Sequence, residues 1–130
     1  MKLLLLSFGR GSGLDHFRQT FSHLPTKNLP TTVRNALEAY DIVMSGQVIG
    51  GLDLNDVANR DPGLDGNPVI MVVETTTRAC GNNELVVSID DRLYQRLISY
   101  TRRENCSLLG LVNDAIALLR YASTQDEVAN

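Results

Sequence analysis

The sequence predicts an α+β protein in which a small α/β N-terminal domain precedes a strand–helix–helix unit that forms an intertwined dimer about a two-fold axis. Two observations carry this fold class. The segment from Glu84 to Ala122 reads as a short strand, a helix, a polar turn and a second helix that is apolar on almost every side. Upstream, the apolar runs Lys2–Phe8 and Val69–Val73 have the length and composition of buried strands.

The composition limits the classes of protein to consider. The chain has 130 residues, 43% of them apolar, no Trp and a formal net charge of −3. The core must therefore be aliphatic, and the charge gives no general argument for nucleic acid or membrane. Cys80 and Cys106 lack metal-ligand spacing and read as free thiols in a reducing compartment. No apolar run is long enough to span a bilayer, so we expect a cytoplasmic protein with no membrane partner, metal or cofactor.

The N-terminal domain is expected over residues 1–78. Its first strand is followed by GRGSG and a short helix, an order that can cradle a phosphate, but neither the GxGxxG nor the P-loop fingerprint is present. His16 and His23 lack a nearby ligand set and read as surface or packing residues. Thr31 is expected to cap a second helix that reaches Met44.

A turn-rich loop and a strand complete this domain. The stretch DLNDVANRDPGLDGN resembles a calcium loop superficially, but Val57 breaks the EF-hand spacing. Val69–Val73 is expected to neighbour Lys2–Phe8 in a small sheet, whereas its pairing with Glu84–Ile89 as a hairpin stays open. No catalytic constellation is legible, so no enzyme is expected.

The C-terminal unit is expected over residues 79–122, followed by an acidic tail at 123–130. Asp90 is predicted to cap the first helix and Ser107 the second, while Asn105 in the turn between them takes the left-handed conformation. Counted over residues 76–122, which include Arg78, there are six arginines against five acidic residues, a slight basic excess inside an acidic protein.

The apolar second helix raises the question of what covers it. A helix without a polar face must be buried, and a unit of 39 residues is too small to bury it alone. A lone strand also leaves its hydrogen-bonding edge unpaired. Two copies would solve both problems by pairing their strands and packing their second helices together. The expected dimer core consists of Leu85, Val87, Ile89, Leu111, Val112 and Ile116.

The stretch VVSIDDRLYQRLISYTRRENCSLLGLVNDAIALL resembles the ribbon–helix–helix DNA-binding family, which includes the Arc and MetJ repressors. The resemblance covers roughly residues 83–122, under a third of the chain. It implies a dimeric, sequence-specific transcriptional regulator whose two-stranded ribbon reads the major groove of double-stranded DNA. The implied base readers are Glu84, Val86 and Ser88, the implied phosphate clamp is Cys106, Ser107 and Leu108, and Arg78 is implied as a contact to the DNA backbone.

Two readings from other classes stay open. The same dimer can act as a protein-interaction or assembly scaffold without DNA, with a protein partner bound through the N-terminal domain. An enzyme using the GRGSG loop is the third reading. Two reader positions depart from the family pattern, because Glu84 repels phosphate and Val86 can touch only a thymine methyl.

Overall fold

A computed structural model of the chain describes residues 1–9, 13–22, 28–46 and 68–129, with side chains described as far as Tyr121. The elements are β1 (Lys2–Phe8), α1 (Gly13–Thr20), α2 (Leu29–Met44), β2 (Val69–Thr75), β3 (Glu84–Ile89), α4 (Asp91–Arg103) and α5 (Leu108–Ala129). Within these residues the protein is α+β, with one three-stranded antiparallel sheet and four helices. Most of the GRGSG loop, His23 and the calcium-like stretch lie outside the described residues.

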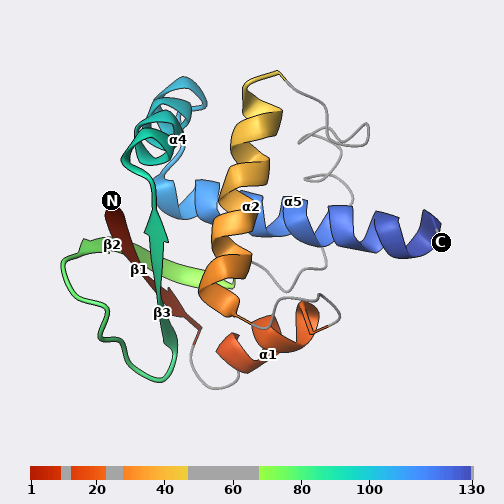
Figure 1. Cartoon of the computed structure of the whole chain (residues 1–130), viewed down its shortest axis with the longest axis horizontal. Helices are drawn as coiled ribbons and strands as arrows, with labels where there is room; N and C mark the ends of the chain where they lie inside the picture. The colour runs from red at the N-terminus through yellow and green to blue at the C-terminus, as the bar shows by residue number, and fades with distance from the viewer. Residues whose placement is uncertain (10–12, 23–27, 47–67, 130) are drawn as a thin grey trace.

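The sheet has the order β2-β1-β3, so the first strand of the chain lies in the middle (Figure 1). Leu5 of β1 pairs with Val73 of β2 on one side and with Val86 of β3 on the other. The expected pairing of the first two strands is therefore confirmed. The open hairpin question is also answered, because β2 and β3 both run antiparallel to β1 and do not pair with each other.

One face of the sheet carries the hydrophobic core. Strand side chains alternate between faces, and the inward-facing Leu4 and Leu6 of β1 and Val87 of β3 are 0% exposed. Helix α2 contacts β3 and α5, and α5 also contacts β2 (Figure 1). Phe17 of α1 packs its ring against Phe8 at the end of β1. The buried residues form one cluster that extends on both sides of the expected domain boundary at residue 78.

Helix α5 is covered by its own chain. Leu111 and Val112 are 0% exposed, and the helix packs mainly against α2, with further contacts to β2 and α4. A second copy is therefore not needed to bury this helix, because the N-terminal segment supplies the cover that the short C-terminal unit lacks. The ribbon–helix–helix dimer is not confirmed by this arrangement.

A buried amide ties α5 to the edge of the sheet. Asn113 is 4% exposed, and its Nδ2 donates to the carbonyl of Val69 at 2.9 Å while its Oδ1 accepts from the Val69 N–H at 3.1 Å. The side chain thus replaces a strand partner for the first residue of β2. Because a buried backbone group without a partner costs free energy, this contact also fixes how far α5 can slide along β2.

The turns and caps follow the sequence signals with one correction. Asp90 Oδ1 accepts from the Arg92 N–H, Ser107 Oγ accepts from the Gly110 N–H, and Asn105 has a φ of 53° in the left-handed region, as predicted. The cap of α2 is Asn28, however, and not Thr31. Pro30 has no N–H to lose and fits the first turn of a helix. Helix α2 therefore begins at Leu29, before Pro30, whereas the sequence predicted that it begins after Pro30.

We expect Asn113→Ala to lower the free energy of unfolding by about 2–5 kcal/mol, because it leaves the N–H and the carbonyl of Val69 buried without partners. Urea denaturation followed by circular dichroism measures the change. Asn35→Ala, an exposed position on α2, is the matched control and should stay within about 0.5 kcal/mol of wild type. A loss below about 1 kcal/mol would show that this amide is not a structural link.

We also expect a fragment of residues 79–130 to remain unfolded, because Leu111 and Val112 lose the cover that α2 and β2 provide in the full chain. Thermal circular dichroism of the fragment and of the full chain compares the two. Cooperative unfolding of the fragment, at a temperature that rises with its concentration, would contradict this expectation and restore an independent C-terminal dimer.

Candidate interaction surfaces

The outer face of the sheet, opposite the core, is a partly exposed apolar surface, on which Leu3, Leu5 and Val86 are half-buried. The register places Val73, Leu5 and Val86 side by side across the three strands on this face. Leu3 and Met71 extend the row toward its two ends. Met71 and Val73 are 44% and 40% exposed. We call these five residues the outer apolar patch.

The three implied base readers lie on this outer face, and each has a local role there. The Glu84 carboxylate accepts a hydrogen bond from the Gly81 N–H at 2.6 Å and a longer one from Ser7 Oγ at 3.4 Å. It thereby closes the turn that leads into β3. Val86 belongs to the outer apolar patch. The Ser88 hydroxyl is buried and has no hydrogen-bond partner among the described residues.

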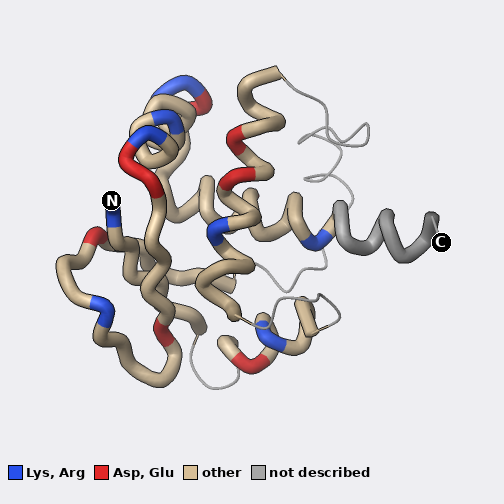
Figure 2. Tube along the Cα trace, viewed as in Figure 1, with Lys and Arg blue, Asp and Glu red and all other residues tan. Residues whose placement is uncertain are grey.

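The implied phosphate clamp lies at the start of α5. Ser107 is exposed, while Cys106 and Leu108 are half-buried. Burial, and after it the charges of Asp114 and Glu104, raises the pKa of the Cys106 thiol. Acidic groups that disfavour a thiolate also disfavour a phosphate, so the local potential opposes the implied clamp. Arg78 is exposed in the connection between β2 and β3. Figure 2 shows several basic stretches along α4.

The expected dimer core is buried within one chain. Val87, Ile89, Leu111, Val112 and Ile116 are at most 2% exposed, and Leu85 is 9% exposed. A side chain that its own chain covers fully has no surface left for a second copy. These residues therefore form the inner core of the subunit, and the dimer itself stays a prediction.

A groove of about 640 Å³ opens beside the end of β3, between α2 and α4. Volumes of this size are typical of ligand-binding clefts. Its walls come from Arg34, Glu38, Asp41 and Ile42 of α2, Leu93 and Arg96 of α4, and Met1, Ser88 and Asp90 at the strand ends. No sequence motif indicates this groove, because its residues lie in three segments that are far apart along the chain, namely Met1, α2 and the stretch from Ser88 to Arg96.

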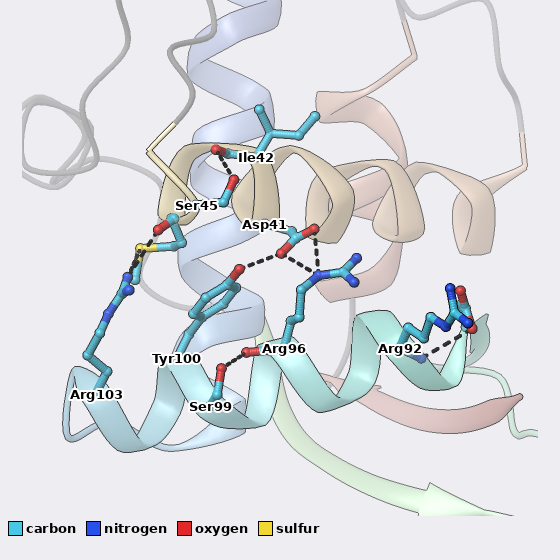
Figure 3. Close-up of polar contacts among 10 residues, drawn as sticks. Asp41, Ile42, Ser45, Arg92, Arg96, Ser99, Tyr100 and Arg103 are labelled. Atoms are coloured by element: carbon cyan, nitrogen blue, oxygen red, sulfur yellow. Dashed lines mark hydrogen bonds and ion pairs between the residues drawn. The ribbon is translucent and has the colours of Figure 1, made fainter.

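Asp41 joins the two helical walls of the groove (Figure 3). Its carboxylate accepts from Arg96 Nε at 3.0 Å and from the Tyr100 hydroxyl. Arg103 of α4 donates to the carbonyl of Met44 of α2 at 3.2 Å. Because Asp41 holds α4 by a charge-assisted bond and a phenol bond together, the width of the groove is set at this residue. On the sequence alone Asp41 is one more polar residue of an amphipathic helix.

The described residues contain no group of three or more His, Cys, Asp or Glu placed to hold a metal ion. Cys80 and Cys106 are both free thiols. None of the described helices has the length and hydropathy that a membrane crossing requires. Comparison of the chain with protein-family models, with curated proteins and with solved structures finds no match.

We expect Asp41→Asn to lower the pKa of Tyr100. In the wild type, burial raises this pKa first, followed by the hydrogen bond to Asp41 and then its charge. Because burial remains in the variant, the pKa should fall without returning to the usual value of about 10. Tyrosine-selective NMR titration measures it, and Glu38→Gln, an exposed carboxylate one turn earlier on α2, is the control.

The same titration has a consequence for stability. A tyrosine whose pKa is raised in the folded state stabilises the fold fully below its unfolded pKa of about 10, and that contribution is lost as the pH rises through the folded value. The free energy of unfolding of the wild type should therefore fall above about pH 10, with a shallower dependence in Asp41→Asn. An unchanged Tyr100 pKa in the variant would contradict the role assigned to Asp41.

Proposed function

We propose that this protein is a protein-interaction module that assembles by packing the outer apolar patch of one copy against that of a second copy. The observation that carries the proposal is the patch itself. A row of three apolar side chains crosses the whole sheet and is flanked by two more, on a face that no described helix covers. Contiguous apolar patches on a folded surface commonly mark interaction sites.

The charge on this face favours a second copy as the partner. Among the described strand residues on this face Glu84 alone is charged; it lies at one corner of the three strands, and the Gly81 N–H already binds it. When two sheets pack face to face about a two-fold axis along or across the strands, a corner residue lies over a different corner of its copy. The two Glu84 side chains are thus kept apart, and the apolar row meets an apolar row.

The small area of the outer face of the sheet limits the affinity of this dimer. The outer strand axes of a three-stranded sheet are only about 10 Å apart, so the contact is smaller than a standard protein interface. Interfaces in this class are weak and transient. We therefore expect a dissociation constant on the order of tens of micromolar, in keeping with a subunit that is folded by itself.

DNA binding by a ribbon–helix–helix dimer is the competing proposal. The resemblance of residues 83–122 favours it, whereas three features of the structure favour the interaction module. A ribbon of two β3 strands would carry β1 and β2 on each side, and a major groove about 12 Å wide admits only two strands. Glu84 is engaged in a turn. Acidic groups lie near the implied clamp.

Sedimentation velocity between about 1 μM and 1 mM tests the proposal. We expect the wild type to form a dimer reversibly, and Val73→Lys to weaken the dimer at least about tenfold, because association would bury a charge without a partner. Ile42→Lys replaces an exposed apolar residue of α2 that lines the groove and lies outside the outer apolar patch, and should leave the association unchanged.

A monomeric wild type over this range would overturn the assembly proposal. Binding of mixed duplex DNA at low salt, weakened by Ser107→Pro and strengthened by Glu84→Gln, would instead support the competing proposal. That binding should weaken with salt, with a log–log slope of roughly −5 for about three phosphate contacts per subunit.

A further inference from the structure

A second surface of the molecule is independent of the outer apolar patch. It is the free edge of β3, and the backbone hydrogen bonds of β1 show which groups point toward it. The Phe8 N–H donates to Asn83 O on the β3 side at 2.8 Å, while the Gly9 N–H donates to Pro68 O on the β2 side at 3.3 Å. Successive residues of a strand direct their backbone groups to opposite edges.

This alternation extends along both strands. Leu4 and Leu6 direct their N–H and carbonyl groups toward β3, like Phe8, so their partners Leu85 and Val87 direct theirs back toward β1. Val86 lies between those two partners, and Ser88 follows Val87. Both residues direct their backbone groups to the opposite edge. No strand lies there among the residues that the structure describes. An open strand edge is a template for an added strand.

The groove described above lies at this edge. Ser88 lines it, and α2 runs beside β3 in the same general direction (Figure 1). Arg34, Glu38 and Ile42 lie four residues apart along α2 and line the groove as a single stripe. Neither Arg34 nor Glu38 forms an ion pair among the described residues, unlike Arg96, which is bound by Asp41. The wall of the groove therefore presents a free cation, a free anion and an apolar side chain in that order.

We propose that the groove binds an extended segment of a partner protein, which adds a strand antiparallel to β3 and pairs with the backbone of Val86 and Ser88. Strand addition of this kind obtains affinity from main-chain hydrogen bonds and specificity from alternate side chains. Antiparallel pairing is the more stable of the two directions. It also fixes which residue of the ligand faces each residue of the stripe on α2.

The spacing of the stripe defines the sequence of the ligand. Residues four apart on a helix are separated by about 6 Å along its axis, and alternate residues of a strand by about 6.8 Å. Three alternate ligand side chains therefore match the three residues of the stripe. Running against the direction of α2, the ligand meets Ile42 first, then Glu38, then Arg34, so it reads apolar–x–basic–x–acidic from its N-terminus.

Binding of two short peptides to the full-length protein tests this proposal. One contains the core Leu-Thr-Lys-Thr-Glu, and the other contains Leu-Thr-Glu-Thr-Lys, which has the same composition and net charge. We expect the first to bind at least about tenfold more tightly, a difference of about 1.4 kcal/mol. Chemical-shift titration by NMR detects weak binding and should place the shifts on α2 and β3.

A charge exchange gives the sharpest result. The double variant Arg34→Glu with Glu38→Lys should prefer the second peptide over the first, because the order of charges on the wall is reversed. Asn35→Ala, on the same helix but outside the groove lining, should keep the wild-type preference. Methylation of alternate backbone nitrogens of the first peptide should abolish binding if the ligand pairs as a strand.

Three outcomes overturn the proposal. They are equal binding of the two peptides by the wild type, an unchanged preference in the charge-exchanged variant, and absence of binding by either peptide. In the last case, protection of the Val86 and Ser88 amides that rises with protein concentration would assign the edge to β3 of a second copy. Val73→Lys does not touch the groove, so peptide binding and assembly can fail separately.

Discussion

The fold of this protein depends on the pairing of β1 along both of its edges. Each residue from Leu3 to Ser7 faces a partner in β2 and another in β3. Since β1 begins the chain while its partners begin at Val69 and Glu84, the sheet requires contacts between residues that are far apart in sequence. The N-terminal and C-terminal segments therefore share one core, and neither has a complete sheet without the other.

The central position of β1 also determines what happens to α5. With β2 and β3 paired to the two edges of β1, the inner face of the sheet and α2 form an apolar surface against which α5 packs. Leu111, Val112 and Ala115 of α5 are 0% exposed. The amide of Asn113, which lies on the same buried side of α5, hydrogen-bonds to the backbone of Val69 at the edge of β2. The core contains Phe and Tyr as well as aliphatic residues, and a core without Trp is sufficient here because α2 and the sheet contact α5 on two sides.

The same arrangement leaves two surfaces without cover. The outer face of the sheet keeps an apolar row because α2 and α5, which contact β3 and β2, pack against the buried side of the sheet. The free edge of β3 stays open because β1 occupies the other edge, and the Asp41 contacts hold α4 at a distance that leaves a groove. In the resemblance to the ribbon–helix–helix family, β3 and the helices after it serve a dimer. In this chain β3 pairs with β1, and α2 covers α5.

Several features follow from the sequence by itself, because short-range physics decides them. The apolar runs of β1 and β2, the alternation of β3, the cap at Asp90, the left-handed Asn105 and the cap at Ser107 depend on neighbours within a few residues. The need to bury α5 is also legible, since its apolar faces are visible in the sequence.

Only the tertiary structure decides what meets these elements. The burial requirement of α5 does not specify its cover, because α2 and a second copy are equivalent sources of apolar surface. The pattern of β3 likewise defines two faces but not which strand occupies each edge. Asn113 and Asp41 look like ordinary polar residues of amphipathic helices until the chain brings Val69, Arg96 and Tyr100 beside them. Hydrogen bonds between residues 44 to 59 positions apart leave no periodic trace in a sequence, whereas caps and strand alternation do.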